Sequence, residues 1–423
     1  MNYEKRVFSN KLRAIVAPMS DTQTVTLWVL FGTGSKYEIK RINGVSHFLE
    51  HLFFKGTKKR PKPADIFNEL DRIGSQHNAF TTKEYTGYYV KAAARHFDIS
   101  LDIVSDILLN PIFKSEEIEK ERGVVLQELS MYEDDPQRQV NETFEELLYG
   151  DQPAGWDTGG YPETVKKITR EDIIKYKHSH YTSSNAVVVV AGNVDLESTF
   201  SKIEKAFSKM PDGRKVEKVK VKESQNKPRV KFKKKDVDQT HVRIGVRGYN
   251  MFDEKRYPMM VLQTILGGNA SSKLFMELRE KLGLTYYAYA SAPEYTDTGY
   301  LVAVAGVPHA KLPQVAKKIV QILKGIKKHG VSQKDIDFAK EYLRGSMALA
   351  FESTDEVASF LGGQELFYKK IMTPEDILQK IEKVTKSDIM KVAREILRPE
   401  KINMAAIGPH DDIKKYEEIL KHV

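Results

Sequence analysis

The sequence contains no cysteine among its 423 residues. Disulfide bonds and thiol chemistry are therefore excluded, although this absence does not identify the compartment. Long apolar stretches are also missing: no run reaches the roughly 18 residues of a membrane-spanning helix, so no membrane association is expected. Residues 1–6 are mostly polar or charged and do not start the apolar core of a signal peptide. A cytoplasmic location is the default expectation.

The sequence also lacks an excess of acidic residues. Lys and Arg number 67 against 58 Asp and Glu, which gives a net charge of +9 and raises the possibility of a nucleic-acid partner. The densest basic stretch, residues 229–235, alternates Val230 and Phe232 with lysines, which is typical of a strand with one solvated face. No recognised nucleic-acid-binding module accompanies it, so no nucleic-acid partner is predicted.

The chain is long enough for about two domains, and a hydrophobic content of 41% allows a substantial core in each. Two segments recur after about 210 residues: 83–90 resembles 293–302, and 169–174 resembles 385–390. We therefore predict an α+β fold with two homologous α/β-sandwich-like domains of about 210 residues each, which arose by internal duplication. The predicted boundaries are 1–211 for the N-terminal domain, 212–238 for a charged connecting segment and 239–423 for the C-terminal domain.

Residues 47–51 read His-Phe-Leu-Glu-His within a helix-forming, largely apolar stretch, and Gly56 stands where a helix C-cap is expected. On a helix, His47 and His51 project from one face, as two ligands of one zinc ion require. Glu50 lies beside them and is available as a base. The order H-x-x-E-H is the inverzincin signature. The alternative is an amphipathic helix with two surface histidines and a solvated glutamate.

A third ligand would decide between these interpretations, because catalytic zinc sites use three protein ligands and a water. Glu121 and Glu128 are two helical turns apart and therefore share a helix face. A carboxylate pair of this kind is often only a solvated face. Together with the histidine helix, however, the pair favours a metal site.

The chain resembles the pitrilysin-like inverzincin zinc peptidases, in the branch of mitochondrial processing peptidase and its bacterial homologues. This resemblance covers nearly the whole chain and is carried by residues 44–57, 78–84, 121–128, 180–193 and 272–286. It implies that His47, His51 and Glu128 bind one Zn²⁺ per chain. It also implies that Glu50 is the general base and that Glu121 assists catalysis.

The resemblance implies substrate-binding residues as well. Residues 76–82 resemble an edge strand beside the metal, where Asn78, Ala79 and Phe80 pair with an extended peptide. In the second half, which lacks the metal motif, Arg279 and Tyr286 match a pair that holds substrate and steadies the reacting carbonyl, Tyr286 as a catalytic donor. Alternatively, they are a helix-surface arginine and a core or strand tyrosine. His178 and His180 have metal-compatible spacing but more simply end a helix.

The function implied is a zinc-dependent endopeptidase that cleaves unfolded peptides or protein extensions inside a closed chamber. Such a chamber needs four domains, and this chain has two with both motifs present, so a homodimer is predicted. A heterodimer with a metal-free paralogue is the competing arrangement. The alternative function is a non-catalytic or heterodimer-dependent subunit of a processing-peptidase-like assembly. It is disfavoured here because all three ligands and the base are present.

Overall fold

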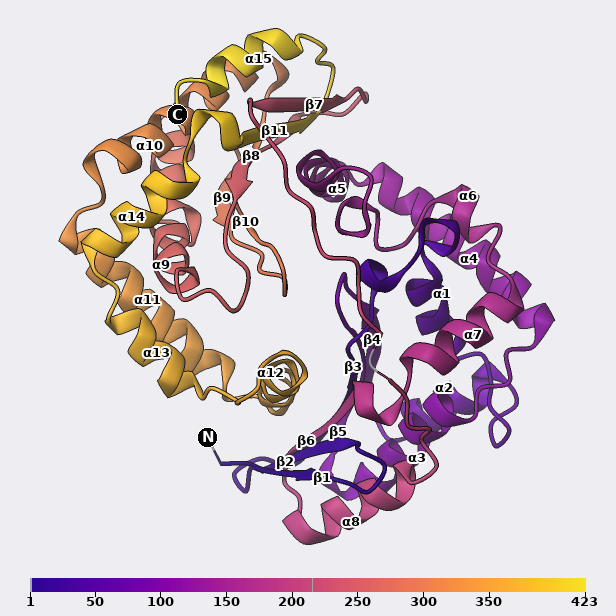
Figure 1. Cartoon of the computed structure of the whole chain (residues 1–423). Helices are drawn as coiled ribbons and strands as arrows, with labels where there is room; N and C mark the ends of the chain where they lie inside the picture. Colours follow the sequence, from indigo (N-terminus) through magenta and orange to yellow (C-terminus); the bar gives the residue numbers. More distant parts are fainter. Residues whose placement is uncertain (1, 215) are drawn as a thin grey trace. The chain divides into compact units, whose positions relative to one another are not determined.

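The computed structural model describes residues 2–214 and 216–423, which form two compact units (Figure 1). The first unit comprises the chain up to Leu129, together with Asp157–Val219 and Met347–Pro374. The second unit comprises Ser130–Trp156, Lys220–Ser346 and Glu375–Val423. Neither unit is continuous in sequence, because each includes a segment from the other half of the chain.

The first unit is built on a six-stranded sheet. Its strand order is β1-β2-β6-β3-β5-β4, with β2 and β6 parallel and the other neighbours antiparallel. The strands β3 and β6 are rich in β-branched residues and almost wholly buried, as expected for strands covered on both faces. The strands span β1 Glu4–Val7, β2 Arg13–Pro18, β3 Thr24–Phe31, β4 Gln76–Thr81, β5 Thr86–Ala93 and β6 Ala186–Gly192.

Helices cover both faces of this sheet. Helices α3 (Phe97–Leu109) and α8 (Leu196–Phe207) pack on β2, β3 and β5, whereas α12 (Thr354–Phe367) packs on β2, β3 and β6. Trp28, Leu30 and Val189 point toward α12 and form one hydrophobic core with Leu361. The strand β4 lies at the edge of the sheet and, among the described residues, pairs with β5 alone.

The second unit repeats this topology in a five-stranded sheet of order β7-β11-β8-β10-β9, with β7 and β11 parallel. Helix α5 (Pro136–Tyr149) packs on β7, β8 and β11, and its Phe144 and Leu148 join Val302 and Ile407 in one core. Helix α10 (Leu312–His329) contacts β8 and β10. The strands span β7 Arg229–Lys233, β8 Thr240–Arg247, β9 Tyr287–Ser291, β10 Tyr300–Val307 and β11 Ile402–Ile407.

The predicted duplication and α/β fold class are confirmed. In the same positions of the two sheets, β6, β3, β5 and β4 correspond to β11, β8, β10 and β9. Helices α7 (Arg170–His180) and α14 (Lys386–Ile396) begin with matching capping boxes. In them, the threonines at 169 and 385 accept hydrogen bonds from the N–H groups of the aspartates three residues later. The lysine-rich stretch forms β7, as its alternation predicts.

The units exchange helices relative to the sequence. Helix α5 comes from the first half of the chain and covers the second sheet, whereas α12 comes from the second half and covers the first sheet. The boundaries 1–211, 212–238 and 239–423 follow the sequence repeat and stay a prediction about the duplicated parts. The compact units have other boundaries than these sequence segments, because each sheet is covered by a helix from the other half of the chain.

The remaining elements connect these layers. No helix among the described residues combines the length and apolar character needed to cross a membrane. The other α-helices are α1 Val45–Leu52, α2 Pro63–Arg72, α4 Ser115–Asp134, α6 Pro162–Val165, α9 Arg256–Gly267, α11 Gln333–Ala350, α13 Pro374–Glu382 and α15 Ile413–Leu420. Short helical segments are η1 Ser35–Tyr37, η2 Lys40–Ile42, η3 Ala94–His96, η4 Pro153–Gly155, η5 Ser183–Asn185, η7 His309–Lys311, η8 Pro399–Lys401 and a π-helical η6 Phe275–Lys281.

Candidate metal centre

The N-terminus of helix α1 is capped by a side chain that precedes the helix by several residues. The helix follows Gly44, whose φ of +98° suits glycine, and Gly44 supplies no capping side chain. Instead, the buried Glu38 carboxylate accepts hydrogen bonds from the N–H groups of Gly44 (2.7 Å) and Ser46 (2.8 Å). The helix ends at Leu52, so the expectation that Gly56 caps it is wrong. Gly56, with a φ of +125°, serves the turn that follows.

Helix α1 presents two imidazoles on one face. The Nε2 atoms of His47 and His51 lie 3.3 Å apart, as their spacing of one helical turn predicts. Only 9% of His47 is exposed, so the alternative of two histidines on a solvated helix surface does not describe this helix. The two nitrogens converge on one point.

Helix α4 brings a carboxylate to the same point. Glu128 Oε2 lies 3.5 Å from His47 Nε2 and 3.3 Å from His51 Nε2. Ligand atoms arranged tetrahedrally at about 2.0–2.1 Å from zinc are separated from one another by about 3.3–3.4 Å. The observed separations match that spacing, so these three residues fit a zinc ion in both chemistry and geometry. They leave a fourth coordination position open.

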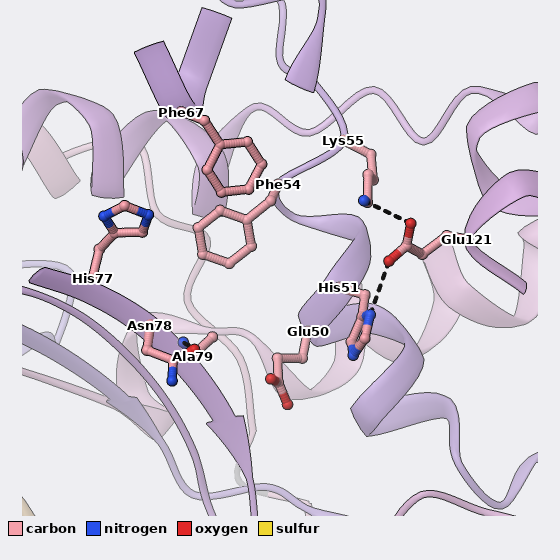
Figure 2. Close-up of a pocket in the computed structure, with 9 residues that line it drawn as sticks. All are labelled: Glu50, His51, Phe54, Lys55, Phe67, His77, Asn78, Ala79 and Glu121. Atoms are coloured by element: carbon pink, nitrogen blue, oxygen red, sulfur yellow. Dashed lines mark hydrogen bonds and ion pairs between the residues drawn. The ribbon is translucent and has the colours of Figure 1, made fainter. Parts of the chain in front are cut away.

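A second carboxylate orients one of the histidines. Glu121 Oε1 lies 2.9 Å from His51 Nδ1, and Lys55 Nζ lies 2.6 Å from Glu121 Oε2 (Figure 2). A Nδ1–H that donates to a carboxylate leaves Nε2 available for a metal. Burial raises the pKa of Glu121, but the hydrogen bonds from His51 and Lys55 outweigh burial and hold this pKa below its usual value. Glu121 therefore orients the ring of His51, and its assisting role in catalysis stays a prediction.

The carboxylates make the site favourable for positive charge. Burial lowers the pKa of His51, but hydrogen bonds to Glu121 and Glu128 outweigh this effect and raise the pKa to about 9. The same negative charges stabilise a divalent cation at the Nε2 atoms.

Glu50 lies beside these ligands without being one of them. Its side chain points toward β4, where Thr81 Oγ1 donates a hydrogen bond of 2.6 Å to Glu50 Oε2. Burial is the main influence on the pKa of Glu50 and raises it. A carboxylate with increased proton affinity, next to a metal site, suits a general base.

A pocket of about 300 Å³ opens beside Glu50 and His51 (Figure 2). One wall is aromatic: the rings of Phe54 and Phe67 stack with centroids 5.9 Å apart, and His77 lies 6.0 Å from Phe67. The pocket can therefore receive an apolar or aromatic group next to the candidate base.

The edge strand β4 forms another wall of this pocket. Asn78 and Ala79, for which substrate binding stays a prediction, line the pocket. The Ala79 N–H donates to the Asn78 side-chain carbonyl (2.9 Å) rather than to β5, so it lies on the free edge of the sheet. Phe80 points to the opposite face, where its ring lies 5.4 Å from that of Trp28. Because N–H groups alternate in direction along a strand, the Phe80 backbone faces Gly87 of β5 and not the free edge.

The remaining predicted residues belong to other elements. Arg279 and Tyr286 lie together in the second unit, where the Arg279 guanidinium is 5.4 Å from the centre of the Tyr286 ring. Tyr286 is 78% exposed, which excludes a core role for its side chain. His180 ends helix α7 with its ring buried against Tyr176. Within the described part of the chain, only the His47–His51–Glu128 group has three potential metal ligands close together.

Several residues of the site were not predicted from the sequence. They are Glu38, which caps α1; Lys55, which contacts Glu121; Thr81, which contacts Glu50; and the pocket residues Phe54 and Phe67. Lys55 lies in the turn that follows α1, only four residues after His51, so its proximity in sequence could have identified it. The other contacts join separate segments and leave no local signal.

Both halves of the chain match models of known protein families. Residues 14–160 match the family described as Insulinase (Peptidase family M16), and residues 167–343 match the Peptidase M16 inactive domain. The uncharacterized zinc protease YmxG of Bacillus subtilis is 34% identical over 400 residues, covering 95% of this chain and 97% of the relative. An uncharacterized zinc protease of Rickettsia felis is 33% identical over 412 residues, with 97% and 98% covered.

Solved structures agree. A protease from Helicobacter pylori superposes with a TM-score of 0.92 at 26% identity, covering 96% of this chain and 99% of that one. Complex III2 from Candida albicans contains a chain with a TM-score of 0.86 at 16% identity, covering 99% of both chains, which shows a shared fold alone. The resemblance to pitrilysin-like peptidases is thus confirmed. With full-length relatives named zinc proteases and family matches in both halves, this chain belongs to peptidase family M16.

Proposed function

We propose that this chain is a zinc-dependent endopeptidase of the inverzincin type, with one Zn²⁺ per chain, acting on unfolded peptides or protein extensions. The observation that carries the proposal is the convergence of His47, His51 and Glu128 beside Glu50. The names of the relatives, which are zinc proteases, support the choice of metal.

The residues divide the work of peptide hydrolysis. Zinc, when held by the three ligands, supplies Lewis acidity that favours proton loss from water and polarises a peptide carbonyl. Glu50 takes the proton from the attacking water and delivers it to the leaving amine, for which burial has raised its proton affinity. Glu121 holds the ring of His51 in the tautomer that exposes Nε2.

Strand β4 is proposed to bind the substrate. An extended peptide would add to its free edge by backbone hydrogen bonds, with the Ala79 N–H exchanging the Asn78 side chain for a peptide carbonyl. Backbone pairing tolerates many sequences, and the aromatic wall of Phe54 and Phe67 adds a preference for apolar side chains. Binding of this kind requires an unfolded segment.

Arg279 and Tyr286 are proposed to hold the substrate and to donate a hydrogen bond to the carbonyl oxygen as it gains charge. Their mutual contact and the exposure of Tyr286 support a surface role. A homodimer that encloses a chamber, and a cytoplasmic location, belong to the same proposal. Sedimentation of the purified chain, alone and mixed with any metal-free paralogue, tests the dimer.

The test of function is hydrolysis of a library of unstructured peptides, read by mass spectrometry. We expect the chain alone to cleave, a chelator to stop cleavage and added zinc to restore it. Glu50→Gln should lower the rate at least about 100-fold with zinc still bound. Glu119→Gln, which changes an exposed glutamate on α4, is the matched control and should keep full activity.

The outcome also separates the two candidate functions. A chain that binds zinc but cleaves nothing alone would support the non-catalytic or heterodimer-dependent subunit instead. Cleavage that persists in Glu50→Gln would remove the proposed base.

A further inference from the structure

Thr81 is the last residue of β4 and makes a polar contact with the candidate base. Its Oγ1 lies 2.6 Å from Glu50 Oε2 and 3.5 Å from the Ser46 carbonyl oxygen. A hydroxyl has one proton to donate, and the much shorter distance assigns that proton to the carboxylate. Hydrogen bonds of this length to an ionised acceptor are among the strong ones.

The contact makes the two oxygens of Glu50 different. Among the residues that the structure describes, Thr81 alone hydrogen-bonds to this carboxylate, and it does so at Oε2. Oε1 is left to act on water. A carboxylate without this bond could rotate about its terminal torsion, because such torsions have broad, shallow minima.

The same strand carries the proposed peptide-binding edge. Side chains alternate along a strand, so His77, Ala79 and Thr81 share the face toward α1. His77 and Ala79 line the pocket, and Thr81 reaches the base. One strand therefore determines both where a peptide backbone pairs and where the proton acceptor stands.

We propose that Thr81 is a positioning residue for Glu50: its hydroxyl holds Oε2 so that Oε1 faces the scissile bond of a peptide paired with β4. This inference rests on the proposed peptidase function. Thr81 does not touch the substrate in this role; it restricts the base. Its loss should slow turnover and leave peptide binding and zinc binding intact.

The test compares two substitutions at one position. Thr81→Val keeps the shape and removes the hydroxyl, and Thr81→Ser keeps the hydroxyl. We expect Thr81→Val to lower kcat about 10- to 100-fold, the effect of one hydrogen bond to a charged group, with KM changed less than about threefold. Thr81→Ser should recover most of the loss. Thr86→Val makes the same change on β5, where the hydroxyl donates to the Thr33 carbonyl, and should leave kcat per folded molecule unchanged.

A binding measurement supplies a readout apart from activity. The library peptide that the wild-type chain cleaves fastest, labelled with fluorescein, is titrated with Glu50→Gln and with Glu50→Gln/Thr81→Val. Equal Kd values and equal zinc contents are expected. Weaker peptide binding in the double variant would make Thr81 part of the docking strand and overturn the positioning role.

The outcomes for inference and function are distinct. If the wild-type chain shows no metal-dependent hydrolysis, the proposed function fails and the positioning role with it. If the wild-type chain is active and Thr81→Val retains its kcat, or Thr81→Ser is as slow as Thr81→Val, only the positioning role is overturned.

Discussion

At the scale of single residues, His180 shows how a buried ring can be required in its neutral form. Its Nδ1 donates to the Tyr176 carbonyl oxygen at 3.0 Å, and its ring stacks on Tyr176. Among the described residues, none offers a hydrogen bond to its buried Nε2. Burial lowers the pKa of His180 to about 4, because a proton on Nε2 would add a charge without a partner.

This histidine should make the fold sensitive to mild acid. The unfolded chain protonates His180 near pH 6.5 and the folded chain near pH 4. The contribution of neutral His180 to the free energy of unfolding is therefore fully present above pH 6.5 and is lost as the pH falls toward 4. Between pH 7 and pH 5 the loss is about 2 kcal/mol. Urea unfolding at both pH values measures it. His180→Asn keeps a donor at the Nδ1 position and should lose about 2 kcal/mol less than wild type over this interval; equal losses would contradict the assignment.

The residues of the site differ in how far sequence could predict them. His47, Glu50 and His51 lie on one helix, where spacing alone determines which side chains share a face. Glu128 required a second helix, and the resemblance to a family selected it from the pair with Glu121. The contact of Thr81 with Glu50 was not predicted, because it depends on the register of β4, and no local sequence pattern indicates that register.

At the scale of elements, strand β7 explains the lysines that suggested a nucleic-acid partner. Lys231 pairs with Glu146 and Lys233 with Glu133, each at 2.5 Å, so acidic residues of α5 and the end of α4 neutralise this strand. The strand lies at the sheet edge, where charged side chains also prevent pairing with other chains. Its basic composition therefore has an account within the fold.

The metal helix depends on an element outside it. Glu38 lies after η1 and accepts from two N–H groups at the start of α1, next to His47. Burial raises the pKa of Glu38 and the hydrogen bonds from Ser46 and Gly44 oppose this effect, so the helix N-terminus compensates for a buried carboxylate. The position of the first ligand is thereby tied to a side chain that never approaches the metal site.

Glu38→Gln should consequently affect both stability and metal binding. The amide offers N–H groups where the helix needs an acceptor, at a cost of about 2–4 kcal/mol in the free energy of unfolding. Zinc affinity should fall with it, because His47 lies in the first turn of α1. Urea unfolding and zinc titration measure the two effects. Thr385→Ala removes the cap of α14 in the other unit and should cost about 1 kcal/mol with zinc affinity unchanged. If Glu38→Gln bound zinc as tightly as the wild type, Glu38 would contribute to the stability of the fold but not to metal binding.

At the scale of the whole molecule, the sequence reveals the duplication but not the exchange of helices between the two sheets. The repeated segments gave the twofold organisation, because matching strands and capping boxes keep matching residues. The exchange of α5 and α12 leaves no such trace. The residue pattern of α5 and α12 indicates that each helix has a buried apolar face. The same pattern would result whichever sheet covered that face, so it does not identify the sheet.

The exchange predicts that the two halves of the chain cannot fold separately. Without α12, a fragment of residues 1–211 exposes one whole face of its sheet, including Ile15, Trp28, Leu30 and Val189, which are now at most 8% exposed. A fragment of residues 212–423 lacks α5 in the same way. An apolar patch of this size favours association or loss of the fold. Each fragment alone should bind a hydrophobic dye and unfold without cooperativity, and co-expression of the two should restore one cooperative transition.

The control is a cut made after folding. Residues 216–220 form neither helix nor strand, so a protease site inserted there can be cleaved in the native protein. The two parts should then stay together on gel filtration and separate only in denaturant, because α5 and α12 each remain packed on a sheet of the other part. Independent, cooperative folding of residues 1–211 would instead mean that α12 is dispensable for the first sheet, and the sequence boundaries would then describe autonomous domains.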